Sequence, residues 1–151
     1  MKKNIPIKLL NDKLQHFKKL ENSPRPSSGW VKAVRTTLGI SLEQLAKKLG
    51  VSKQNVQSME KREQEMTITL KSLQELANAM DMKLVYALVP IDSSLDALID
   101  RKASELAKKI VSQTAHNMSL ENQMVSEEQL NYALEARKEK IIQEMPKALW
   151  D

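Results

Sequence analysis

Amide and basic side chains gather in residues 52–62 and could read the edges of DNA bases. Glutamine and asparagine match the donor–acceptor pair on adenine, whereas lysine can reach guanine or a phosphate. Basic residues at the end of this stretch suit phosphate contacts. The residues that we expect to contact double-stranded DNA are Gln44, Ser52, Lys53, Gln54, Asn55, Gln57, Ser58, Lys61 and Arg62. The chemistry of this set is recognition rather than catalysis.

Catalytic patterns are missing from the rest of the sequence. The two histidines, His16 and His116, lie far apart in the chain. No HExxH pattern, phosphate-cradling glycine-rich loop or nucleophile elbow occurs. Cysteine is absent, which excludes disulfides and thiolate metal sites. We therefore expect a protein that is not an enzyme and that has no catalytic residue, metal or cofactor.

Two short helices joined by a turn at Gly50 are predicted to position the DNA-contacting side chains. Residues 41–44 have the spacing of a capping box, in which a serine oxygen caps backbone amides and Gln44 reaches back. Gly50 allows the positive φ that the turn requires, and Ser52 is a good cap for the second helix, which buries Val56. This pattern is typical of a helix-turn-helix, although a small helical bundle with a polar exterior would share most of it.

The apolar patterns divide the chain into three regions and predict a mainly α fold. The regions are a basic N-terminal helix and linker at 1–27, a helix-turn-helix domain with a terminal strand at 28–90, and a helical region at 91–151. Three glycines and five prolines leave little for the turns of an all-β fold.

Further helices are predicted on either side of the helix-turn-helix. They are expected at about residues 7–21, 30–38, 70–80, 94–116 and 126–146. Within the domain, Trp30, Leu38 and Leu70 are expected to face inward. Ser126 begins a second capping box, which predicts the start of the last helix.

A single β-strand is predicted after these helices of the domain. Its residues are Leu84, Val85, Tyr86, Ala87, Leu88 and Val89. One strand alone leaves its backbone amides and carbonyls unpaired, which is costly when they are buried. We therefore expect it to pair with the same strand of a second copy and to form a homodimer that matches a palindromic operator.

Charge is distributed unevenly along the chain. Residues 1–90 contain 16 Lys/Arg and 8 Asp/Glu, whereas residues 91–151 contain 8 and 11. This asymmetry suggests two different partners, with nucleic acid for the basic part, although ordinary solubilising charge would give the same count. The longest apolar run, 84–90, is far too short to span a membrane, and no signal peptide opens the sequence. We expect a cytoplasmic protein with no membrane partner.

Residues 28–90 resemble the Cro/repressor-type (Xre family) helix-turn-helix domain, on the strength of residues 41–60. Nearly everything after residue 28 resembles a bacterial group called mobile mystery protein A, through segments 29–35, 68–73, 84–90 and 118–123. The resemblance implies a lambda-repressor-like bundle with added N- and C-terminal helices. Members of that group are typically encoded beside a Fic-domain protein, mobile mystery protein B. This implies an antitoxin and autorepressor whose residues 91–151 bind a Fic-domain toxin.

The same resemblance implies an inhibitory motif near residue 120. Fic enzymes transfer AMP from ATP to target hydroxyls, and many are restrained by a helix with the pattern Ser/Thr-x-x-x-Glu-Gly/Asn. Asn117, Glu121 and Asn122 match it, except that Asn117 replaces the Ser/Thr. By resemblance, the glutamate pairs with the arginine that would hold the ATP γ-phosphate. The alternatives are that Glu121 is a solvated residue in a turn, and that the chain is a stand-alone dimeric repressor whose C-terminal helices only oligomerise.

Overall fold

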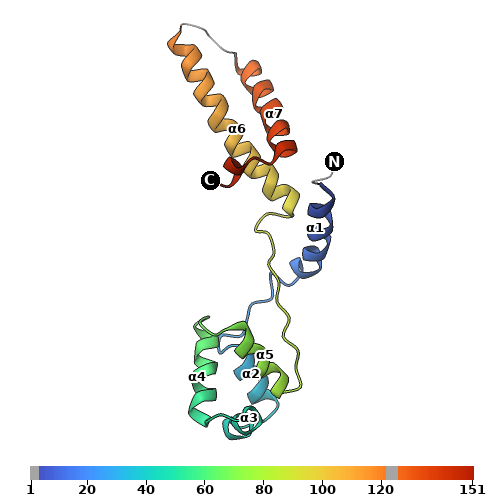
Figure 1. Ribbon diagram of the computed structural model, residues 1–151, viewed down its shortest axis with the longest axis vertical. Coiled ribbons are helices and arrows are strands. Elements are labelled where there is room, and N and C mark those ends of the chain that lie inside the picture. Colours follow the sequence, from blue (N-terminus) through green and yellow to red (C-terminus); the bar gives the residue numbers. More distant parts are fainter. Residues whose placement is uncertain (1–3, 122–125) are drawn as a thin grey trace. The chain divides into compact units, whose positions relative to one another are not determined.

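The structure, a computed structural model, describes residues 4–121 and 126–151 and is mainly helical (Figure 1). The helices of these described residues are α1 (Asn4–Lys18), α2 (Trp30–Thr37), α3 (Leu42–Leu49), α4 (Lys53–Gln64), α5 (Leu70–Ala79), α6 (Leu95–Leu120), α7 (Glu127–Glu144) and the 3-10 helix η1 (Lys147–Trp150). The prediction of a mainly α fold is thereby confirmed. The chain forms two compact units, the α2–α5 unit (Leu20–Ala87) and the α6–α7 unit (Met1–Lys19 with Leu88–Asp151).

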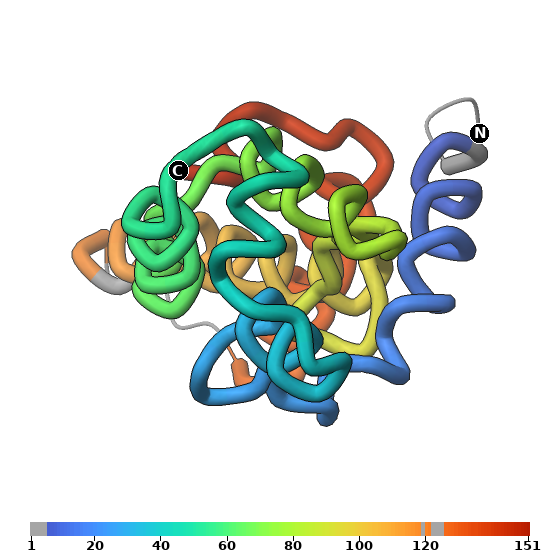
Figure 2. Tube along the Cα trace, turned by 90° about the horizontal axis from the view of Figure 1, so that it is seen from below, coloured from blue at the N-terminus to red at the C-terminus, as the bar shows by residue number. Residues whose placement is uncertain are grey.

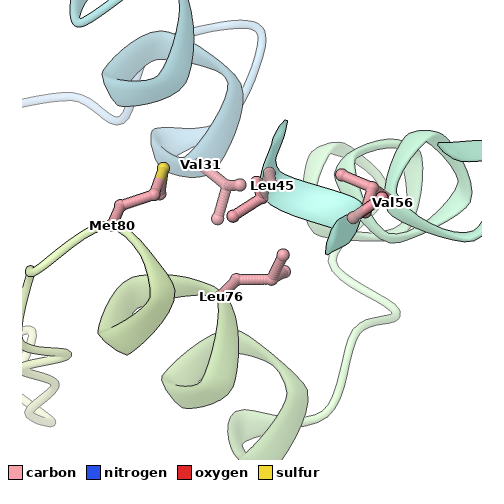
Figure 3. Packing of buried hydrophobic residues seen from close by; sticks show 6 residues of the cluster. Val31, Leu45, Val56, Leu76 and Met80 are labelled. Atoms are coloured by element: carbon pink, nitrogen blue, oxygen red, sulfur yellow. The ribbon is translucent and has the colours of Figure 1, made fainter. Parts of the chain in front are cut away.

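The α2–α5 unit is built around one small apolar core. Val31, Leu45, Val56, Leu76 and Met80 come from or directly follow the four helices and point toward one another (Figure 3). The course of the chain through these helices, from blue to yellow-green, can be followed in Figure 2. No surface of Leu45, Val56 or Leu76 is exposed. Because interiors of this kind are close-packed, the core fixes how α4 lies against the other three helices.

The predicted helix ends of this unit are confirmed. Ser41 and Gln44 form a complete capping box at the start of α3, and Gly50 ends that helix with φ 68°. The Ser52 hydroxyl oxygen accepts from the backbone N–H of Asn55, and the hydroxyl of Thr69 caps α5 in the same way. These caps satisfy amides that the helices themselves leave unpaired.

The α6–α7 unit is a helical hairpin with additional elements at its base. Ala103, Ala107, Ile141 and Leu149 form its buried core, and Leu149 belongs to η1. The capping box predicted at Ser126 is present at the start of α7. Helix α6 continues to Leu120, beyond the predicted end near residue 116.

Helix α1 is tied to the start of α6 by side-chain hydrogen bonds. The Asn11 Oδ1 atom accepts from the backbone N–H of Leu95 at 2.9 Å, and Gln15 donates to the carbonyl of Ser93 at 3.1 Å. The Lys18 ammonium donates to the carbonyl of Pro90 at 2.6 Å. Helix α1 therefore completes the N-terminal cap of α6, together with Ser94, whose hydroxyl accepts from Ala97.

Two expectations from the sequence are not met in the described part of the chain. Residues 83–90 have no regular secondary structure, and no strand occurs at 4–121 or 126–151. A strand needs a neighbour for its backbone groups, and a single copy offers none here. Trp30, Leu38 and Leu70 were expected inward but are each more than half exposed, because the apolar interior of this small unit is filled by others.

Within 4–121 and 126–151, no helix is both long and apolar enough to cross a bilayer.

Candidate nucleic-acid interface

Helix α4 presents a row of polar side chains on the surface of the α2–α5 unit. Its inner side is buried at Val56, Glu60 and Glu63, whereas its outer side is exposed. The exposed residues of the predicted set are Gln44, Ser52, Lys53, Gln54, Asn55, Gln57, Ser58 and Lys61. Within α4, four of these follow the i, i+3, i+4, i+7 spacing of one helix face: Gln54, Gln57, Ser58 and Lys61. The structure thus brings amide and basic groups together on one face.

An open hollow lies beside this face of α4. An open polar hollow of about 420 Å³ is lined by Lys32, Gln54, Gln57, Ser58, Glu60, Lys61 and Gln64. Lys32 comes from α2 and was not among the predicted residues. Its exposed ammonium adds a second cation to the same hollow, where an anionic backbone could be bound. A signal for it existed in the sequence, since Lys32 is a basic residue just inside a predicted helix.

Lys53, at the first turn of α4, forms an ion pair across the turn. Its Nζ atom lies 2.9 Å from Oε1 of Glu43, which belongs to α3. The pKa of Glu43 is lowered from its ordinary value, chiefly by the hydrogen bond from Lys53. Both side chains remain about half exposed or more. The Lys53 side chain is therefore accessible, although its ammonium already forms an ion pair with the carboxylate of Glu43.

Gln44 has a structural partner within its own helix. Its Oε1 atom accepts from the backbone N–H of Ser41 at 2.8 Å, and the hydroxyl of Ser41 accepts from the N–H of Gln44 at 3.0 Å. The side-chain oxygen of Gln44 thus braces the start of α3, as the predicted capping box requires. Gln44 also lies beside Lys47 and Lys48 on the surface of α3.

Arg62 differs from its neighbour Lys61. The Lys61 side chain is 74% exposed and its Nζ lies 4.0 Å from Glu65. Arg62 is half-buried, and its Nε atom is buried without a hydrogen-bond partner among the described residues. Lys61 is consequently much freer than Arg62 to contact a phosphate.

Two buried carboxylates on the inner side of α4 hold this helix in place, and neither was predicted. The first is Glu60, whose two oxygens accept from Nε and Nη2 of Arg35 at 3.0 Å each. Arg35, in α2, also donates from Nη1 to the carbonyl of Ile40 at 3.1 Å. Both partners are nearly buried, so the ion pair is a fork-to-fork contact shielded from water. It fixes α4 against α2.

The second carboxylate, Glu63, serves as the N-terminal cap of α2. Its oxygens accept from the backbone N–H groups of Trp30 and Val31 at 2.8 Å each. Gly29, which precedes α2, has φ 88°, and a Cβ atom there would lie 2.8 Å from Glu63 Oε1. A glycine is therefore required at this close approach. The spacing of Glu60 and Glu63 from Val56, at i+4 and i+7, already placed both on the inner face of a helix.

Arg25 joins the N-terminal segment of this unit to the end of α4. Its guanidinium donates to the carbonyl of Glu63 at 2.6 Å and to that of Gln64 at 3.1 Å. Helix C-termini have unpaired carbonyls and a partial negative charge, which suits a cation. The predicted linker thus contributes a C-terminal cap to α4.

The residues of the other two predicted sites are placed as follows. Asn117 is exposed in the last turn of α6, and Glu121 follows that helix and is exposed, its N–H donating to the carbonyls of Asn117 and Met118 at 3.2 Å. Asn122 lies outside the described residues. In the predicted strand, Val85, Tyr86, Ala87 and Leu88 are exposed, while Leu84 and Val89 are half-buried.

Comparison with known proteins identifies the domain that contains α4. Residues 31–86 match the family model described as Helix-turn-helix. The chain therefore carries an Xre/Cro-type helix-turn-helix domain over these residues, as the sequence predicted. No curated protein matches the chain, and no solved structure matches it.

Proposed function

We propose that the chain regulates transcription by binding double-stranded operator DNA as a homodimer, with the N-terminal part of α4 in the major groove. The observation that carries this proposal is the exposed face of α4, in a domain that matches the helix-turn-helix family. In such domains the second helix of the motif reads base edges with its N-terminal residues. Gln54 and Asn55 lie at that end, so they are the proposed base-reading residues. Lys32 and Lys61 are the proposed phosphate contacts.

The test is a titration of the full chain against DNA from its own promoter. A fluorescent duplex of that promoter and a shuffled duplex of equal length would be compared at the same salt concentration. Specific binding should exceed non-specific binding by about 10³-fold or more. Equal affinity for the two duplexes would contradict a role as a sequence-specific regulator.

We further propose that the chain is the antitoxin of a toxin–antitoxin pair, and that its α6–α7 unit holds and silences a Fic-domain adenylyltransferase. The sequence resemblance and the acidic balance of residues 91–151 support this role. Glu121 is exposed just after α6, where a partner protein can reach it. A carboxylate that pairs with an active-site arginine keeps the γ-phosphate of ATP from aligning for attack. The alternative is a stand-alone dimeric repressor whose α6 and α7 only oligomerise.

The antitoxin function requires that a Fic-domain protein be encoded beside this chain, and the absence of such a neighbour would favour the stand-alone repressor. The two proteins would be co-purified, and AMP incorporation would be compared for wild type, Glu121→Gln and Glu121→Ala. Glu121→Ala should retain the complex, because one carboxylate supplies little of an interface, yet the complex should now transfer AMP. Glu121→Gln should be intermediate at best, because it keeps the shape and loses the charge. A variant complex that forms and stays silent would assign inhibition to steric cover or to another residue.

A further inference from the structure

An open groove runs between α6 and α7 in the half of the hairpin that is far from η1. Its volume is about 370 Å³, and its floor is apolar. The floor includes Val111, Ala115 and Met118 of α6, with Leu130 and Ala133 of α7. Two of these residues are alanines, so the helices leave space between them that no described side chain fills.

The groove continues an apolar seam that is covered at its other end. Along α6, Ala103, Ala107, Ile110 and Met118 lie on one helix face, since they are separated by three, four or eight positions. At the first two residues, Leu149 of η1 packs onto the seam and is itself buried. From Ile110 to Met118 the same face lines the open groove. A third apolar element thus packs on the seam at its η1 end, whereas the seam is an open groove at the other end.

The charges around the groove favour an occupant that carries carboxylates. Its two charged lining residues, Arg137 and Lys140, are both cations, although residues 91–151 are acidic overall. Neither forms an ion pair with a described residue, whereas Lys138 between them lies 2.8 Å from Asp100. Unpaired cations beside an apolar floor are complementary to an apolar segment that carries carboxylates.

We propose that this groove binds an amphipathic helix of the partner protein, with apolar side chains at i, i+3/i+4 and i+7 on the floor and a carboxylate beside Arg137 and Lys140. Helices commonly dock into hydrophobic grooves through such anchors. The inference rests on the proposed antitoxin function and specifies its docking surface. Met118 lines the groove and Glu121 follows it by less than one helical turn, so a docked partner would lie next to that glutamate.

The experiment measures by calorimetry how the full chain binds the Fic-domain protein that the proposed function requires. Ala133→Trp fills the groove and should weaken binding by about 30-fold or more, as loss of a central anchor does. Asn131→Trp is the matched control, because Asn131 is exposed on the same helix and does not line the groove. It should change the affinity by less than about threefold.

A second pair of variants keeps the fold of the hairpin while reversing charge. Arg137→Glu combined with Lys140→Glu should also weaken binding by about 30-fold or more. The control is Lys108→Glu combined with Lys147→Glu, two exposed lysines outside the groove that give the same change in net charge. Circular dichroism and thermal melting would establish that each variant is folded.

The outcomes separate the docking surface from the function. If the wild type does not bind the Fic-domain protein, the antitoxin function is wrong. The proposal that a helix of this protein occupies the groove is then wrong as well. If the wild type binds and both groove variants bind equally well, the groove is not the docking surface. The proposed antitoxin function is then unaffected. Groove variants that bind the Fic-domain protein normally but change the sedimentation coefficient of the free chain would assign the groove to a second copy instead.

Discussion

Individual residues of α4 have separate tasks on its two sides. On the inner side, Glu60 and Glu63 hold the helix against α2 through buried hydrogen bonds. On the outer side, Gln54 and Lys61 are exposed and have room to contact a ligand. Substitutions on the outer side should therefore change DNA binding with little change in stability, and those on the inner side should do the reverse.

Gln54→Ala should reduce affinity for the native promoter by roughly 1–3 kcal/mol, since a bidentate amide contact to a base is lost. Affinity for a shuffled duplex should stay the same. Fluorescence anisotropy with both duplexes measures the effect, and Gln74→Ala in α5 is the matched control because Gln74 is also an exposed helical glutamine. Lys61→Ala should instead weaken both duplexes alike and reduce the salt slope by about 1. Unchanged promoter affinity in Gln54→Ala would show that this residue reads no base.

Glu43→Gln should raise affinity for all DNA by about two- to fivefold, because it releases Lys53 from its ion pair. Since the pKa of Glu43 is lowered by Lys53, the pair is intact above the ordinary carboxyl pKa and is lost only as the pH falls through the lowered value. The gain should therefore be constant between roughly pH 6 and 8. The control is Glu75→Gln, an equal charge change at an exposed residue of α5. An equal gain in DNA affinity in both variants would mean that the change in net charge causes it, and not the release of Lys53.

Among the elements, α2 and α4 are joined by a buried ion pair and by the cap that Glu63 provides. Glu60→Ala leaves Arg35 buried without its partner, and breaking a buried pair in this way costs about 3–5 kcal/mol. Urea denaturation followed by circular dichroism measures the change in the free energy of unfolding. Glu65→Ala, at an exposed position, should cost less than about 0.5 kcal/mol. The double variant Arg35→Met/Glu60→Leu should recover most of the lost free energy of unfolding. If it does not, the ion pair contributes more to stability than its own desolvation costs.

The elements also show which features a sequence can predict. Caps and the turn at Gly50 were predicted correctly because each depends on residues within three or four positions. The contacts of Glu63 with Trp30 and of Arg25 with the end of α4 were missed because they join residues more than thirty positions apart. Trp30 and Leu70 were placed inward because periodicity gives the face of a helix and not how much of that face its neighbours cover. The strand predicted at 84–89 is absent from the single chain, because a strand needs a neighbour for its backbone groups.

At the scale of the whole molecule, the proposed homodimer depends on residues 84–89. Tyr86→Pro removes a backbone donor from the segment and should shift the chain toward monomer in analytical ultracentrifugation. Tyr86→Ala keeps that donor and should weaken the dimer less. Because Tyr86 is exposed in the single copy, neither change should unfold the α2–α5 unit, which thermal melting can check. A Tyr86→Pro variant that dimerises as strongly as wild type would exclude this segment from the dimer interface.

The capping of α2 by Glu63 has a consequence for hydrogen exchange. The first amides of a helix have no intrahelical acceptor and ordinarily exchange rapidly with solvent. Here the amides of Trp30 and Val31 are held by a side chain of α4, so they should exchange only when α4 separates from α2. Their protection, measured by mass spectrometry or NMR, therefore reports how often α4 detaches from the rest of its unit. A ligand that binds α4 and holds it against α2 should slow hydrogen exchange at the amides of Trp30 and Val31, although it contacts neither of them.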